Sequence, residues 1–138
     1  MKELAEIIQQ APVFLGFFEN AQDVFHEFFD ADREGGALEG LVKTHPDRHI
    51  LFAVYGAGGY EGSAFVLFER DGELYEVNAS HCSCYGLEDQ WDPEETTVDA
   101  LAYRLNEGKL GDANGEDFSG ALAEFLGVAL KPQLRDDE

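Results

Sequence analysis

The sequence predicts an α+β domain in which helices from both ends of the chain pack against an antiparallel sheet. Apolar residues recur with a helical period in the first thirty residues and again after residue 92. Between them, apolar runs rich in β-branched and aromatic residues are separated by turn residues, as in consecutive strands. The resulting order of two helices, three strands and two helices is typical of α+β proteins.

The N-terminal part of the chain predicts two helices. Leu4, Ile7, Ile8 and Ala11 share one face of a short helix, and Pro12 suits the first position of a second one. Apolar residues with a period near 3.6 then predict an amphipathic helix of about five turns, which ends before the two glycines at 35 and 36. Its apolar face consists of Phe14, Phe17, Phe18, Ala21, Phe25, Phe28 and Phe29.

The middle of the chain, 48–78, predicts a three-stranded antiparallel β-meander. Asp71-Gly72 is the strongest turn signal, because a two-residue type I′ turn needs positive φ at both central positions. The strand before this turn has apolar residues on both faces, which indicates a strand covered on both sides or a central strand. One face carries Phe65 and Leu67, and the other carries Ala64, Val66 and Phe68.

Two helices are expected after the meander. Asp92-Pro93-Glu94-Glu95 has a capping residue, a proline at the first helical position and an acid at the third, with Thr96 or Thr97 as an alternative cap one turn later. The final helix has an apolar face of Phe118, Ala121, Leu122, Phe125, Leu126 and Ala129. Residues 1–132 thus form one predicted domain, and 133–138 a frayed tail.

Composition limits the classes of function. The 138 residues include 29 acids and 9 Lys or Arg, a net charge of −20, which repels nucleic acids and anionic membranes. No apolar run approaches the roughly 18 residues of a membrane span, and the N-terminus lacks the features of a signal peptide. We therefore expect a cytoplasmic protein that contacts neither nucleic acid nor membrane directly.

One stretch, SHCSCYGLEDQWDPEE from Ser80 to Glu95, holds both cysteines, the only tryptophan and five carboxylates. With the strands before it, this stretch resembles a family of small uncharacterised proteins from phages and prophages that share SHCSCYGLE-x-QW-x-PEET. The resemblance spans about Gly59 to Leu105. It implies an origin on a mobile element, where small acidic proteins often act on host systems. It implies no particular activity, which has to be argued from the residues.

A zinc site is one interpretation of this stretch. Cys82, Cys84 and His81 are zinc-binding residue types. His45 and His49 could complete a Cys2His2 set if the loop before the first strand folds onto this stretch. The Cys-x-Cys spacing is shorter than in usual zinc motifs, and free cysteines commonly serve as small buried residues. Motifs for a nucleophile, a phosphate loop or a dinucleotide site are not found in the sequence. No cofactor other than zinc, and no catalytic residue, is predicted.

Binding to a basic protein is the other interpretation, and we favour it. Nine acids and no Lys or Arg occur from Asp71 to Tyr103, and a surface of one sign usually serves steering or recognition. Such a surface can occupy the basic groove of a DNA-handling protein. The predicted partner-binding residues are Glu73, Glu76, Tyr85, Glu88, Asp89, Trp91, Asp92, Glu94, Glu95 and Asp99.

The expected function is inhibition of a host nucleic-acid-handling protein by a phage-type accessory protein with a DNA-like surface, as in anti-CRISPR or anti-restriction proteins. Tyr85 and Trp91 would supply apolar anchors. Other interpretations remain. The acids could merely solvate a monomer or reflect a salt-rich habitat, with Trp91 covering the core. The chain could also be a zinc-stabilised domain, a metal-dependent enzyme, or a structural or regulatory phage component that self-assembles.

Overall fold

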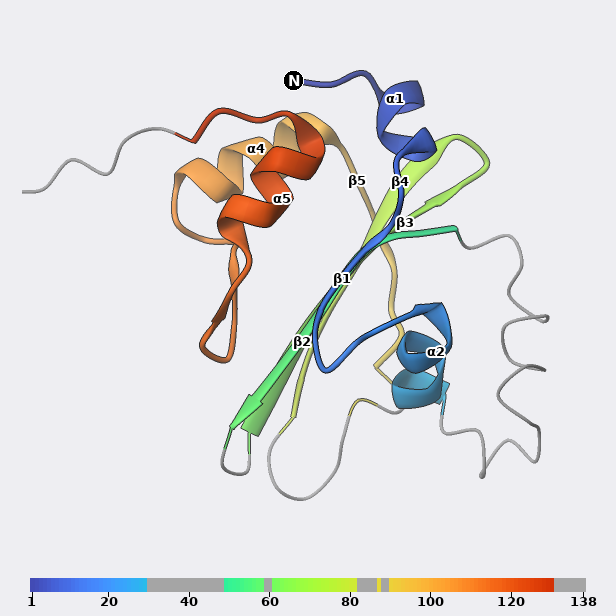
Figure 1. Ribbon diagram of the computed structural model, residues 1–138, viewed down its shortest axis with the longest axis vertical. Coiled ribbons are helices and arrows are strands. Elements are labelled where there is room, and N and C mark those ends of the chain that lie inside the picture. Colours follow the sequence, from blue (N-terminus) through green and yellow to red (C-terminus); the bar gives the residue numbers. More distant parts are fainter. Residues whose placement is uncertain (30–48, 59–60, 82–86, 88–89, 131–138) are drawn as a thin grey trace, which may run out of the picture.

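The computed structural model describes residues 1–29, 49–58, 61–81, 87 and 90–130 and confirms the α+β class (Figure 1). A five-stranded sheet has α2 on one face, while α1, α4 and α5 lie on the opposite side (Figure 1). The elements are α1 (Leu4–Gln9), β1 (Val13–Gly16), α2 (Ala21–Phe29), β2 (His49–Gly58), β3 (Glu61–Arg70), β4 (Glu73–His81), β5 (Glu94–Thr96), α4 (Val98–Asn106), β6 (Asp112–Ala113), β7 (Glu116–Asp117) and α5 (Ser119–Leu126).

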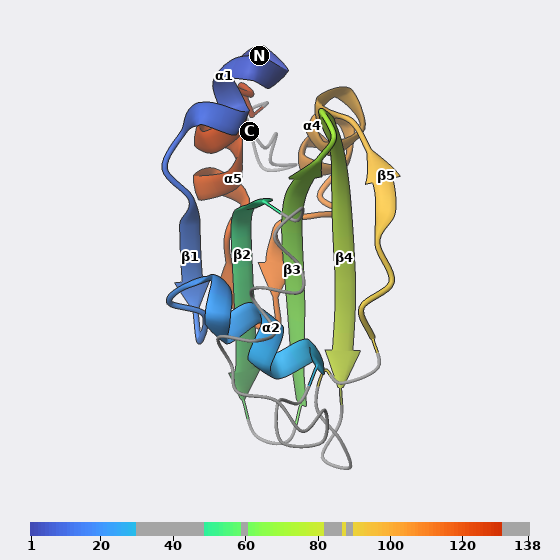
Figure 2. The same ribbon diagram turned by 90° about the vertical axis from the view of Figure 1, so that its right-hand side faces the viewer.

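The three predicted strands form the centre of this sheet as β2, β3 and β4. Their pairing is antiparallel, and the predicted turn between β3 and β4 has positive φ at both Asp71 (55°) and Gly72 (84°). The meander is part of a larger sheet than expected, because β1 pairs in parallel with β2 and β5 pairs antiparallel with β4. Figure 2 shows the resulting order, with β1 and β5 at the two edges.

Both faces of β3 are buried, as the sequence predicted. Phe65 and Leu67 belong to the core between the sheet and the helices α1, α4 and α5. Ala64, Val66 and Phe68 belong to a second core beneath α2, which also contains Phe25 and Phe28. Burying apolar area on both faces compensates the conformational entropy of a short chain with high charge.

The predicted long N-terminal helix is wrong in its first half. Val13–Gly16 is strand β1, and α2 begins only at Ala21. At Gly16 the backbone has φ of 67°, and a Cβ there would lie 2.1 Å from the carbonyl oxygen of Tyr55. Asn20 then caps α2, because its side-chain oxygen accepts a hydrogen bond from the Asp23 amide at 2.9 Å. The chain thus turns sharply at Gly16 and restarts as a helix.

The predicted helix start at Asp92 is also wrong, and the alternative cap at Thr97 is confirmed. Glu94–Thr96 is strand β5, which pairs with Leu74, Tyr75 and Glu76 of β4. The hydroxyl oxygen of Thr97 accepts a hydrogen bond from the amide of Ala100 at 3.0 Å and so begins α4. The helix starts only after β5, because Glu94–Thr96 pairs with the outer edge of β4 as a strand.

The C-terminal part contains a hairpin that the sequence analysis missed. Asn114 and Gly115 have φ of 50° and 96° and form the turn between β6 and β7. Helix α5 follows and buries Leu122, Phe125 and Leu126 as predicted, but it ends before Ala129 because Gly127 adopts a left-handed conformation. The predicted frayed tail lies outside the described residues.

Candidate partner-binding site

The predicted acidic surface follows one edge of the sheet. We call Glu73, Asp92, Glu94, Glu95 and Asp99 the acidic edge. All five side chains are exposed. They come from β4, from the segment that leads into β5, from β5 itself and from the first turn of α4, which are consecutive or paired elements (Figure 2). The fold therefore gathers them at the β5 side of the molecule.

Basic side chains in the described parts of the chain form no ion pair with this edge, although Arg70 lies opposite Glu73 in the β3–β4 ladder. Arg104 is bonded to Glu76, Arg70 lies 3.9 Å from Asp71, and His49 lies 3.5 Å from Glu69. Within the described residues, no Lys or Arg forms an ion pair with any member of the acidic edge. The carboxylates thus repel one another through solvent.

Two members of the edge interact directly. Glu95 lies opposite Tyr75 in the β4–β5 ladder, so it is diagonal to Glu73 on the same face of the sheet. Hydrogen bonding to Glu73 and the negative charge of Glu73 raise the pKa of Glu95. Glu94 points to the opposite face because side chains alternate along a strand. The acidic edge therefore presents charge on both sides of β5.

The prediction that Glu76 belongs to the partner-binding surface is wrong, because its side chain lies in the interior. Its side chain is 5% exposed, and Arg104 of α4 donates a hydrogen bond to its Oε2. Asn78 donates a second hydrogen bond to Oε1 at 2.7 Å. Burial raises the pKa of Glu76, but the hydrogen bonds from Arg104, Asn78 and Thr96 outweigh it, so the net pKa is lowered. The side chain is thus held ionised inside the β4–α4 junction.

Trp91 is half-buried and packs as part of the core. Its ring stacks on Phe68 of β3 with centroids 5.4 Å apart, and it contacts Phe25 and Phe28 of α2 at 5.8 and 5.2 Å. The indole therefore packs against both α2 and the sheet. This favours the alternative in which Trp91 covers the core over the one in which it anchors a partner.

The predicted zinc ligands are not brought together in the described part of the chain. His49 begins β2 and His81 ends β4, and because these two strands run parallel to each other, the two residues lie at opposite ends of the sheet. Among the described residues, no group of three or more His, Cys, Asp or Glu could hold a metal ion. Cys82, Cys84, His45, Tyr85, Glu88 and Asp89 lie outside the described residues.

His81 has a structural partner that the sequence did not suggest. Its Nε2 lies 2.6 Å from the hydroxyl of Tyr55, across the sheet from β4 to β2. Gly62 of the intervening strand makes this possible, because a Cβ at that position would lie 2.5 Å from Nε2. The imidazole thus lies directly over the β3 backbone.

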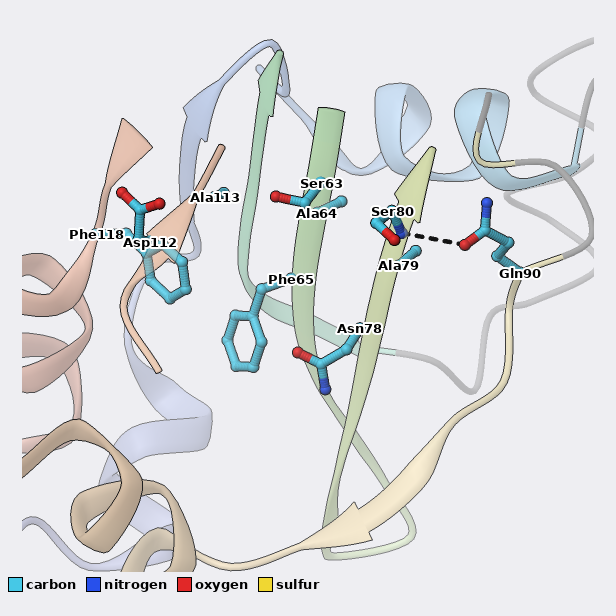
Figure 3. Close-up of a pocket in the computed structure, with 10 residues that line it drawn as sticks. All are labelled: Ser63, Ala64, Phe65, Asn78, Ala79, Ser80, Gln90, Asp112, Ala113 and Phe118. Atoms are coloured by element: carbon cyan, nitrogen blue, oxygen red, sulfur yellow. Dashed lines mark hydrogen bonds between the residues drawn. The ribbon is translucent and has the colours of Figure 1, made fainter. Parts of the chain in front are cut away.

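A polar cavity of about 340 Å³ lies where the sheet emerges from beneath α5 and the β6–β7 hairpin (Figure 3). Phe65 and Phe118 lie on one side, and Asn78 and Ser80 on the other (Figure 3). The Gln90 side-chain oxygen accepts a hydrogen bond from the Ser80 amide at 3.1 Å. None of the described lining residues is Lys, Arg or His, so the cavity offers no cation for an anionic ligand.

This cavity was not found by sequence reasoning because its walls come from strands, a connecting segment and the C-terminal hairpin. The lining residues are distributed from Ser63 to Phe118 and carry no shared motif. The only relevant signal was the change from apolar to small polar residues towards the end of β4, at Asn78 and Ser80. That change also fits an ordinary solvated strand.

Fold and site together define an α+β domain with an anionic sheet edge. Comparison with protein-family models, with curated proteins and with solved structures finds no match to this chain. In the described part of the chain, no helix is long and apolar enough to cross a membrane. Its function is therefore argued from the geometry of the acidic edge.

Proposed function

We propose that this protein binds a basic surface of a nucleic-acid-handling protein and blocks the groove that would hold the phosphate backbone. The observation that carries the proposal is the acidic edge, in which five exposed carboxylates form no ion pair with a Lys or Arg of the described residues. A phage or prophage origin, which the resemblance of the Ser80–Glu95 stretch implies, would fit an inhibitor of a host defence system, of the anti-CRISPR or anti-restriction class.

The negative charge of the folded chain favours binding to a cationic partner. A folded chain with a net charge of −20 carries self-repulsion that it would lose on meeting a cationic partner. Complementary charge speeds diffusional encounter and excludes partners of the same sign. Nucleic acids are excluded by this rule, whereas proteins that evolved to hold phosphates present the required cationic groove. The acidic edge therefore fits a partner defined by phosphate binding.

The proposal is tested by capturing bacterial lysate proteins on the immobilised chain and washing at rising salt. The test variant removes the acidic edge as Glu73→Gln, Asp92→Asn, Glu94→Gln, Glu95→Gln and Asp99→Asn. The control variant removes the same number of charges from exposed acids elsewhere, as Glu6→Gln, Glu61→Gln, Glu107→Gln, Glu116→Gln and Glu124→Gln. Both variants have the same net charge, so they separate position from total charge.

We expect the unchanged chain and the control variant to retain the same basic, nucleic-acid-binding protein at low salt and to release it at high salt. The acidic-edge variant should lose it. Nucleic acid added as a competitor should displace the partner from the column, because both bind one groove. Equal losses in both variants, or a captured protein that salt and nucleic acid leave in place, would refute the proposal.

A further inference from the structure

A second cavity, separate from the one in Figure 3, lies at the end of the β4–β5 pair beside α1. Its volume is also about 340 Å³. Leu4 of α1, Leu74 of β4 and Val98 of α4 contribute apolar side chains, and Glu73 and Glu95 of the acidic edge line it as well. Because the cavity lies at the end of the two strands, residues from both sheet faces border it.

The surroundings of this cavity are anionic. Exposed acids adjoin three of its lining residues in sequence: Glu3 precedes Leu4, Asp71 precedes Gly72, and Asp99 follows Val98. One basic residue is also near, because Arg70 lies opposite Glu73 in the β3–β4 ladder. Of the described lining residues, none is Lys, Arg or His. The cavity thus combines an apolar interior with a negative margin. A simple solvated acidic surface does not have this combination.

We propose that this cavity receives an arginine side chain of the basic partner. The proposal rests on the proposed function and names one contact within it. The aliphatic stem would lie on Leu4, Leu74 and Val98, and the guanidinium would lie between the carboxylates of Glu73 and Glu95.

Other occupants fit less well. An anionic group would be repelled by Glu73 and Glu95, and a wholly apolar side chain would remove water from these carboxylates without replacing its hydrogen bonds. A guanidinium donates several hydrogen bonds in a fixed plane and can serve two carboxylates at once. It would also offset the repulsion between Glu73 and Glu95, which the free protein carries. Arginine therefore satisfies both parts of the site.

The proposal can be tested without the partner, by titrating the ¹⁵N-labelled full chain with n-butylguanidinium and following its amide resonances. This probe has both a stem and a cation. Guanidinium ion serves as the control without the stem, and n-butylurea as the control without the charge. We expect saturable shifts at Leu74, Thr96 and Val98 with n-butylguanidinium, and an affinity at least about fivefold weaker with either control.

Two double variants locate the site. Glu73→Gln with Glu95→Gln should weaken n-butylguanidinium binding by about tenfold, because both charge-assisted contacts are lost. Glu61→Gln with Glu116→Gln removes two exposed acids elsewhere and should leave binding within twofold. Equal binding to both double variants, shifts spread over the whole acidic surface, or equal binding of guanidinium ion would overturn the proposal.

These results are independent of partner capture. If n-butylguanidinium binds as expected but no basic protein is captured, the arginine site stands and the proposed function fails. If a basic protein is captured through the acidic edge but the probe does not bind in the cavity, the proposed function stands and the arginine site fails.

Discussion

Two glutamates of the acidic segment have opposite surroundings in the folded protein. Glu76 and Glu95 both lie in the run of nine acids. Glu76 is buried against Arg104, whereas Glu95 is exposed beside Glu73. Alternation along β4 could have indicated the first case, because Glu76 is two residues from the buried Leu74. The second case depends on the β4–β5 register, which brings together residues more than twenty positions apart.

The buried ion pair predicts a large effect of Arg104→Met. Removing the guanidinium leaves the Glu76 carboxylate buried without its cation, and we expect a loss of roughly 2 kcal/mol in the free energy of unfolding. This is less than for a fully buried pair because Arg104 is partly exposed. The matched control is Lys109→Met, since Lys109 is exposed in the segment after α4, and it should cost less than about 0.5 kcal/mol. Urea unfolding of both variants at pH 7 makes the comparison; similar losses would contradict it.

The contact between Glu73 and Glu95 predicts that Glu95→Gln stabilises the fold at neutral pH. A raised pKa means that the folded state binds a proton more tightly than the unfolded chain, so ionising Glu95 costs stability as pH rises through that pKa. The gain in Tm from Glu95→Gln should therefore be present at pH 7 and shrink as pH falls below the raised pKa. It should also shrink at 1 M salt. Glu61→Gln is the control, and a gain of equal size there would mean that only net charge matters.

At the scale of helices and strands, the sequence predicted the elements with a local cause and missed those set by distant contacts. Asp71-Gly72 carries its turn conformation in its own residue types, and the strands around it follow. The segment Val13–Gly16 is apolar and short, so its residues fit a helix face as well as an edge strand. Pairing with Phe52–Tyr55 decides between them, and that contact is invisible in the sequence.

The start of α4 predicts different effects for the two candidate caps. Thr97→Ala should cost about 1 kcal/mol, because it removes the hydrogen bond to the Ala100 amide. Asp92→Ala should cost little, since Asp92 is exposed and precedes β5. Both are measured by urea unfolding. If Asp92→Ala proves the more costly, the helix begins a turn earlier than the structure places it.

The turn after β1 predicts a large effect of Gly16→Ala. Both Gly16 and Gly72 have positive φ, so alanine is strained at either position by about 1 kcal/mol. Nothing lies near a Cβ at Gly72, whereas at Gly16 the Tyr55 carbonyl oxygen would be 2.1 Å away. We expect a total loss of about 3 kcal/mol for Gly16→Ala and about 1 kcal/mol for Gly72→Ala, measured by thermal unfolding. Equal losses would mean that β1 does not pack closely on β2.

At the scale of the whole molecule, composition gives the net charge, but the fold decides whether the charged side chains lie together on one surface. The net charge of −20 follows from counting residues, but the acidic edge requires β5 to lie beside β4 and α4 to begin directly after it. A functional surface and a merely solubilising one can have the same composition. They differ in whether the repulsion is concentrated, because charges within a Debye length of about 10 Å at 0.1 M salt repel most strongly.

Concentrated repulsion predicts opposite salt effects on stability and on binding. Raising NaCl from about 0.05 to 0.5 M should raise the Tm of the unchanged chain, because screening relieves self-repulsion, while it weakens capture of the basic partner. The rise in Tm with salt should be smaller for the acidic-edge variant than for the control variant of equal net charge. The reason is that the five acids removed from the edge are neighbours in paired or consecutive elements. Thermal scans of the three proteins across this salt range measure it. If the two variants respond equally, the repulsion is spread over the surface, and the acids act by solvating the chain and not by forming one recognition site.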